Sequence, residues 1–109
     1  TGLSETARLS LQAMQILETV AQYGNPNSIT DAGVGAQMAY VGAVGSVYNV
    51  LINLKDIEDE QFDKQISQQC ADILQKAGNA HMIVQKIVYE KIEKLRLSQE
   101  ISFSSSINL

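Results

Sequence analysis

The sequence has little of several residue types that build catalytic, metal-binding or disulfide-linked sites. Among its 109 residues are one cysteine, one histidine, one proline and no tryptophan. The single cysteine, Cys70, cannot form a disulfide within the chain, and no set of cysteine and histidine has the spacing of zinc ligands. We therefore expect a reducing compartment, the cytoplasm, and no bound metal.

Basic residues are also scarce. Eight lysines and arginines stand against twelve aspartates and glutamates, which gives a net charge of −4 at pH 7. A surface that binds nucleic acid needs clustered lysine and arginine, so this balance argues against a nucleic-acid partner. The first residues, TGLSETAR, are polar, and we expect no signal peptide.

What the chain does contain is apolar residues at helical spacing. Hydrophobic residues make up 45% of a chain long enough for one small domain. In residues 4–22, apolar side chains recur in steps of three and four, which predicts an amphipathic helix. Its apolar face consists of Ala7, Leu11, Met14, Leu17 and Ala21. Gly24 follows, as glycine often does just past a helix C-terminus.

A polar stretch, GNPNSITD, separates this helix from the next. Pro26 disfavours helical backbone angles at Asn25, so we expect a short connection there. Ser28 stands three residues before Asp31, which is the spacing of a capping box, and Thr30 is an alternative N-cap. A second helix is predicted to begin at this point.

The second helix has an unusual composition. Residues 32–54 hold no charged side chain over about 35 Å of helix, a length that could cross a bilayer. Gln37, Asn49 and Asn53 interrupt the run, and its flanks are mainly acidic, whereas spanning helices usually have basic flanks. We therefore predict a central helix buried on all sides, and no membrane partner.

Two stripes of side chains run along this helix. The first is small and then polar, and it comprises Ala32, Gly35, Ala39, Gly42, Ser46, Asn49 and Asn53. The second is bulky and apolar, and it comprises Val34, Met38, Val41, Tyr48 and Ile52. We predict that the first stripe allows another backbone to approach closely and that the second packs in the core. Two other helices cannot cover so apolar a helix, so a second copy or a further part of the domain must do so.

The third segment begins with acidic residues and continues as a helix. The stretch DIEDEQFD lacks the glycine and final glutamate of a calcium loop, so we interpret its acids as favourable charges at a helix start. The apolar face then keeps its phase through Gly78, which predicts one helix from about 59 to 97, with a helical hairpin as the alternative. This face comprises Phe62, Ile66, Ile73, Ala77, Ala80, Val84, Ile87 and Val88. Residues 98–109 form a serine-rich tail without helical periodicity, to which we assign no role.

Two stretches taken together, GNPNSITDAGVGAQMAY and VYNVLINLKDIEDEQF, resemble a known family. They are similar to the cyclodeaminase domain of formimidoyltransferase-cyclodeaminases and to related methenyltetrahydrofolate cyclohydrolases. Family members carry, before this region, an N-terminal half with a glycine-rich segment expected to help form the folate site. Nothing in this sequence corresponds to that half. The resemblance therefore implies that residues 1–97 are the C-terminal half of a cyclodeaminase-like helical domain.

The resemblance implies a folate reaction. Cyclodeaminases convert 5-formimidoyltetrahydrofolate into 5,10-methenyltetrahydrofolate and ammonia, a step of histidine degradation. N10 attacks the formimidoyl carbon and the departing nitrogen gains a proton, so the reaction needs orientation and one proton-transferring group. No cofactor beyond the tetrahydrofolate substrate is implied. The implied partners are a second copy, in a homodimer or higher assembly, and a fused or separate formimidoyltransferase domain.

Five residues are candidates for the folate site. Asp31 is the only charged side chain between Glu18 and Lys55, and it either transfers the proton or caps the helix. Asn and Ser are common in turns and helix caps, which would explain Asn25 and Ser28 without a ligand. Only the resemblance implies that they bind the pterin or the glutamate of folate. The last two, Asn49 and Asn53, either face a polar ligand or pair across helices, because unpaired amides are costly to bury.

Four other notable side chains are assigned structural roles. His81 lies outside the two quoted stretches and is predicted to face solvent. Cys70 is predicted to be a small core or boundary residue, since nothing near it in the sequence would activate the thiol. Tyr40 and Tyr48 could stack on a pterin, but core packing is the preferred interpretation.

The sequence thus predicts an all-α fold, a dimer-forming multihelical bundle with a long central helix and a long C-terminal helix. Besides cyclodeaminase activity, two alternatives remain open. A methenyltetrahydrofolate cyclohydrolase differs only in exchanging water at the same carbon. A non-catalytic helical dimerisation module would use the same uncharged helix. In that case Gly42→Leu would break assembly and Asp31→Asn would change nothing measurable.

Overall fold

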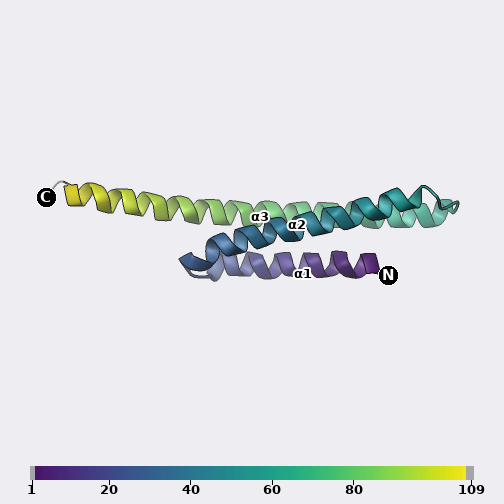
Figure 1. The fold of residues 1–109 in the computed structure, drawn as a ribbon, viewed down its shortest axis with the longest axis horizontal. Helices are drawn as coiled ribbons and strands as arrows, with labels where there is room; N and C mark the ends of the chain where they lie inside the picture. Colours follow the sequence, from purple (N-terminus) through teal and green to yellow (C-terminus); the bar gives the residue numbers. More distant parts are fainter. Residues whose placement is uncertain (1, 108–109) are drawn as a thin grey trace.

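The computed structural model describes residues 2–107, which form three helices and two short connections. α1 spans Gly2–Tyr23, α2 spans Pro26–Leu54 and α3 spans Glu60–Ile107. The chain reverses direction at each connection, so α2 runs antiparallel to both α1 and α3 (Figure 1). Residues 2–107 contain no strand, and the predicted all-α class is confirmed.

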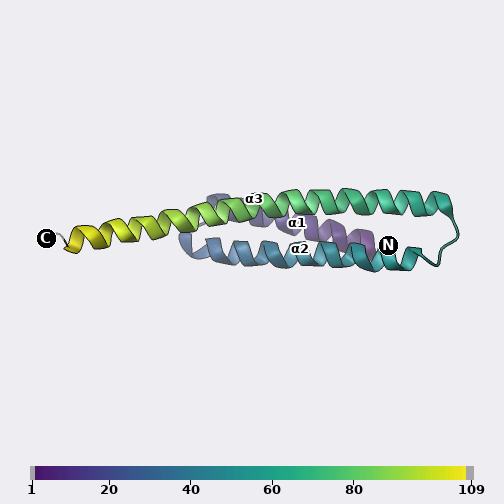
Figure 2. The ribbon, with the colours of Figure 1, turned by 90° about the horizontal axis from the view of Figure 1, so that it is seen from above.

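The bundle is a long rod of 76 × 18 × 15 Å. Each helix contacts the other two, and α3 continues well beyond the end of the bundle toward its C-terminus (Figure 2). Over the described range, none of the helices combines the length and the hydropathy required to cross a membrane.

The core consists of two small clusters where the helices meet. One cluster joins all three helices and contains Ala21, Ile29, Ala32, Ala36, Val84 and Val88. The other contains Met14, Ala43 and Ala77, with Leu11, Ala39, Tyr40 and Ala80 packed against it. Alanine makes up much of both clusters, so the helices pack closely and each cluster buries little volume.

The predicted apolar face of α1 is confirmed, because Ala7, Met14 and Ala21 are at most 1% exposed. Gly24 ends this helix without adopting a positive φ. Its N–H donates to the Val20 carbonyl oxygen at 2.7 Å, and a Cβ on Gly24 would overlap that oxygen. Glycine is therefore required at position 24 because a side chain would overlap the Val20 carbonyl oxygen, and not because the backbone is left-handed.

Within this chain α2 is buried on one face only, in agreement with the expectation that two other helices cannot cover it. Its buried residues, Ile29, Ala32, Ala36, Ala43, Val47 and Leu54, lie on one face toward α1 and α3. The bulky stripe predicted to pack in the core is instead 58–71% exposed, from Ile52 at the lower value to Met38 at the higher. Two neighbouring helices cover only one side of a third, so the opposite side of α2 remains bare.

α3 is one continuous helix through Gly78, as its unbroken apolar phase predicts. Its acidic start is confirmed too, since Asp59 Oδ1 accepts from the N–H of Phe62 at 3.1 Å. Phe62 was predicted to lie on the apolar face of this helix, but its side chain is 43% exposed and lies outside the core. The predicted end near 97 is also wrong, because the helix continues to Ile107; the last two residues of the serine-rich tail lie outside the described range.

Replacing Gly78 with alanine should stabilise the protein. A Cβ at Gly78 would meet no atom within 4 Å, and the residue lies inside α3. Alanine restricts the unfolded chain and favours helix, so the free energy of unfolding should rise by about 0.5–1 kcal/mol. Urea denaturation followed by circular dichroism measures the change. No gain would show that α3 is broken at this point in solution.

Cys70 is 2% exposed, which confirms the prediction of a core or boundary residue. Burial raises the pKa of its thiol above the usual value, so the thiolate is scarce in the folded protein. We expect a disulfide reagent at pH 8 to label Cys70 at least tenfold more slowly in the native protein than in urea. Equal rates would contradict this burial.

Candidate functional site

The start of α2 holds Asn25 and Ser28 together in one cap. Asn25 has an extended backbone, with φ −75° and ψ 165°, as expected for the residue before Pro26. Its Oδ1 accepts from both the N–H and the hydroxyl of Ser28, each at 3.1 Å. The N-cap is therefore Asn25, and the predicted caps at Ser28 and Thr30 are wrong. Because proline is favoured at the first helical position, α2 begins at Pro26, before the start predicted from Ser28 or Thr30.

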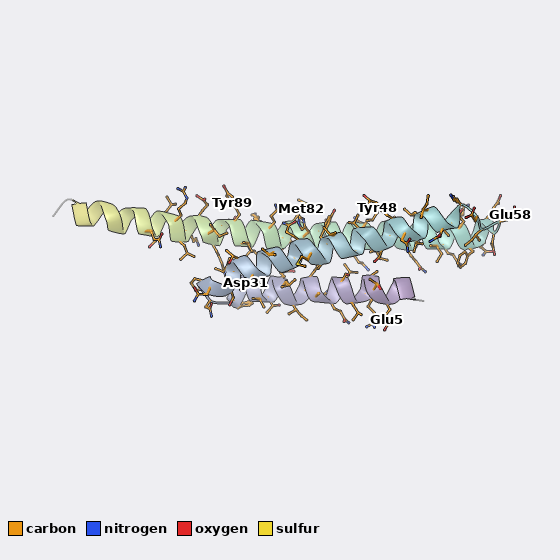
Figure 3. All side chains as sticks on the ribbon, in the orientation of Figure 1. Glu5, Asp31, Tyr48, Glu58, Met82 and Tyr89 are labelled. Atoms are coloured by element: carbon orange, nitrogen blue, oxygen red, sulfur yellow. The ribbon has the colours of Figure 1, made fainter. Side chains whose placement is uncertain are left out.

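Asp31 lies in the second turn of α2, six residues past the cap, and is exposed. It does not cap the helix, because Asn25 already does so. Figure 3 shows Asp31 near the start of α2, on the part of the helix beside α1. Its carboxylate is open to a ligand or to a partner.

A groove of about 290 Å³ lies between α2 and α3; Thr30 and Val34 line it on either side of Asp31 in the sequence, and Asp31 is not part of the lining. Its wall is mainly apolar, and its polar groups come from Thr30, Gln37, His81 and Gln85. The His81 Nε2 lies 2.8 Å from Gln37 Oε1, and its ring centroid lies 4.4 Å from that of Tyr40. A groove with apolar walls and a few polar groups suits a flat ring with a polar edge.

The prediction that His81 faces solvent is wrong. The side chain is half-buried between α2 and α3, held by Gln37 and Tyr40. The sequence could have indicated this burial. Steps of four and three place His81 on the same helix face as Ala77, Val84 and Val88. Tyr40 packs against the core as predicted, whereas Tyr48 is 65% exposed.

Lysine side chains form the remaining polar feature near the cap. Lys91 of α3 donates from Nζ to the carbonyl oxygens of Ala21 and Gln22, so a cation closes the C-terminal end of α1. Lys94 lies beside it, along a shallow depression that also includes Pro26. The sequence pattern did not predict that these lysines lie near the cap, because it does not show that α3 packs against the connection between α1 and α2.

Asn49 and Asn53 lie at the other end of α2 and are both exposed. Asn53 Nδ2 donates to the Asn49 carbonyl oxygen at 2.7 Å, so the pair across helices considered from the sequence is not formed. Asn49 is 18 residues from Asp31, or about 27 Å along the helix. One chain therefore does not bring the five candidates into one pocket. Within residues 2–107, no group of three His, Cys, Asp or Glu side chains could hold a metal ion.

Comparison with known proteins points to one family. The family model described as formiminotransferase-cyclodeaminase matches residues 4–72. Formimidoyltransferase-cyclodeaminase of Gallus gallus is 38% identical over 68 residues, which are 62% of this chain and 13% of that protein. The Sus scrofa protein of the same name is 39% identical over 83 residues, 76% of this chain and 15% of that protein.

A second kind of relative is a methenyltetrahydrofolate cyclohydrolase of Methylorubrum extorquens. It is 31% identical over 85 residues, which cover 78% of this chain and 41% of the relative. The chain thus spans less than half of the length of each relative. A comparison with solved structures found no match. Because the family model covers more than half of the residues, the chain belongs to the formiminotransferase-cyclodeaminase family.

Proposed function

We propose that this chain supplies folate-binding and proton-transferring residues to a cyclodeaminase. The reaction is conversion of 5-formimidoyltetrahydrofolate into 5,10-methenyltetrahydrofolate and ammonia, an ammonia-lyase step of one-carbon and histidine metabolism in the cytoplasm. The observation that carries the proposal is the family match over residues 4–72, because it includes all five candidate residues.

Asp31 has the position and the chemistry for the proton transfer. The formimidoyl group enters as its protonated amidinium. N10 of the folate forms a bond to the formimidoyl carbon, the C=N π electrons move to the exocyclic nitrogen to leave an amino group, and N10 gives its proton to the Asp31 carboxylate. The same carboxyl group then protonates the exocyclic nitrogen, the bond from that nitrogen to the carbon breaks, and ammonia leaves. Attack within one molecule depends mainly on orientation, so one such group is enough.

The surroundings of Asp31 suit the rest of a folate. The groove between α2 and α3 has apolar walls and the polar pair Gln37 and His81, a combination that suits a pterin ring. Asn25 and Ser28 lie at the positive end of α2, with Lys94 across the depression, where a glutamate carboxylate would be favoured. Tetrahydrofolate is the substrate in this proposal, and no other cofactor takes part.

Other polypeptide must complete this site. The chain spans 13–41% of the length of the relatives cited, and its two groups of candidates are far apart. We include a second copy of the chain and a fused or separate formimidoyltransferase domain among its partners.

Calorimetry with tetrahydrofolate and an ammonia-release assay with 5-formimidoyltetrahydrofolate test the proposal on this chain together with the polypeptide that completes its site. Binding in the micromolar range together with ammonia release supports it. A complete, folded domain that contains this chain and neither binds tetrahydrofolate nor releases ammonia would overturn it.

The bacterial relative favours a second candidate, methenyltetrahydrofolate cyclohydrolase. That reaction adds water at the same carbon of 5,10-methenyltetrahydrofolate and needs the same transfer of one proton. Hydrolysis of 5,10-methenyltetrahydrofolate without ammonia release from the formimidoyl substrate would favour this candidate over the first.

A further inference from the structure

His81 is the only histidine of the chain, and it lies on the apolar face of α3. Its neighbours on that face, Ala77, Val84 and Val88, are at most 9% exposed. A polar ring among such side chains is costly unless it has a hydrogen-bond partner. Valine or leucine would pack at this position without that cost, so the packing of α3 on α2 does not by itself explain a histidine there.

The partner of His81 comes from α2. The His81 Nε2 lies 2.8 Å from Gln37 Oε1, and the two residues are 44 positions apart in the sequence. An amide oxygen only accepts, so Nε2 carries the proton and donates it. The Tyr40 ring, tilted by 36° to the imidazole at a centroid distance of 4.4 Å, restricts the rotation of His81. Two residues of another helix thus fix both the orientation and the tautomer of His81.

Each member of this pair keeps a polar group for a ligand. In the neutral imidazole, Nδ1 of His81 has a lone pair and accepts, while the amide NH₂ of Gln37 donates. Gln37 is exposed, His81 is half-buried, and both line the groove between α2 and α3. A ligand in the groove can therefore meet an acceptor and a donor whose positions are linked by one hydrogen bond.

The rest of the groove suits the faces of a flat ring. Its apolar lining includes Val34 of α2 and Val88, Tyr89 and Ile92 of α3. Val34 is 61% exposed and Tyr89 is 67% exposed, so both have free surface for a ligand to cover. Apolar walls bind a ring through its faces, and a few polar groups then fix its rotation through its edge.

The polar pair is complementary to one edge of a pterin. A 2-amino-4-oxopteridine presents the acceptor O4 beside two donors, N3–H and the 2-amino group. The Gln37 amide donates to O4, and Nδ1 of His81 accepts from N3–H or the amino group. The Gln37 amide cannot turn over without losing the bond from His81, which holds this pattern in place. A 2,4-diaminopteridine has a donor in place of O4, and that donor would meet the donors of Gln37.

We infer that His81 and Gln37 are specificity-determining residues that select the 2-amino-4-oxo edge of a pterin in the groove between α2 and α3. The family model matches residues 4–72, which include Gln37 and stop short of His81. The inference rests on the proposed function for the identity of the ligand. It adds which two side chains choose the ring and which of its edges they bind.

Gln37→Glu tests the inference by reversing the preference. The variant keeps the size of the side chain, but its carboxylate only accepts, so it repels O4 and favours a 4-amino group. In the complete domain that contains this chain, the wild type should bind 6-methylpterin about tenfold or more tightly than 2,4-diamino-6-methylpteridine. The variant should show the opposite order. Titrations followed by the fluorescence of each pteridine measure the dissociation constants. An unchanged order, or a wild type that binds neither compound, would overturn the inference.

His81→Phe keeps a ring beside Tyr40 and removes both nitrogens. Circular dichroism should show unchanged helix content, while the dissociation constant for 6-methylpterin should rise about tenfold or more. Gln12→Glu makes the same change as Gln37→Glu at an exposed position of α1 outside the groove, and it is the matched control. Its dissociation constants should equal those of the wild type. Pterin binding that is unaffected by His81→Phe would contradict the role of His81.

The single histidine also allows its tautomer to be observed directly. Nitrogen NMR of the chain should show Nε2 protonated and Nδ1 unprotonated in the neutral ring, and the opposite tautomer would overturn the assignment. Turnover is measured separately from these tests. A domain that selects the pterin as expected but releases no ammonia rejects only the proposed function. Ammonia release with unchanged pteridine preference in both variants rejects only this inference.

Discussion

If the proposed function holds, replacing Asp31 with asparagine in the complete domain should lower the turnover of 5-formimidoyltetrahydrofolate by about 100-fold or more, because the amide cannot accept and return the proton. The side chain keeps its size and can still form hydrogen bonds. We therefore expect tetrahydrofolate binding and helix content to change little. Steady-state release of ammonia and calorimetric binding, measured on the same sample, separate the two effects.

Asp72→Asn is the matched control for this prediction. Asp72 is an exposed aspartate on α3 that forms an ion pair with Lys76 at 3.0 Å. Exposed pairs of this kind contribute little to stability, so turnover and folding should both stay near wild type. Equal turnover in the Asp31 and Asp72 variants would exclude Asp31 as the proton-transferring group.

Met14→Ala should destabilise the fold by about 2–4 kcal/mol, because it leaves a cavity among closely packed alanines. Met14 is fully buried and is the largest side chain of its cluster, where Ala43 and Ala77 have no length to fill the space. Urea denaturation followed by circular dichroism measures the lost free energy of unfolding.

Met82→Ala removes the same atoms from an exposed position of α3, where Met82 is 68% exposed. Its effect on the free energy of unfolding should stay within about 0.5 kcal/mol. A loss of the same size in both variants would mean that the two methionines have similar environments in solution. The cluster around Met14 would then not be the core.

The helices could be predicted from the sequence because their apolar periodicity is strong. α1 kept its predicted face, and α3 ran through Gly78 because its phase did not change there. Boundaries were less reliable. A proline after Asn25 set the start of α2 more strongly than the capping-box spacing at Ser28 did.

The arrangement around the candidate site depends on contacts between distant residues, which a single sequence does not encode locally. His81 meets Gln37 across 44 positions, and Lys91 reaches Ala21 across 70. The bulky stripe of α2 was predicted to pack in the core because its side chains are large and apolar, but it is exposed in the chain. Periodicity shows that a face is apolar, but it does not show which molecule covers that face.

The core of this protein cannot form until its last helix has been synthesised. Both core clusters require α3, since Val84 and Val88 belong to one and Ala77 to the other. When α1 and α2 leave the ribosome, neither cluster can close, and the inner apolar side of α2 stays exposed until α3 has been made. Nascent chains should therefore need protection from aggregation until this part of α3 has been made. A chain arrested before residue 77 should remain bound to chaperones, however well its first two helices form.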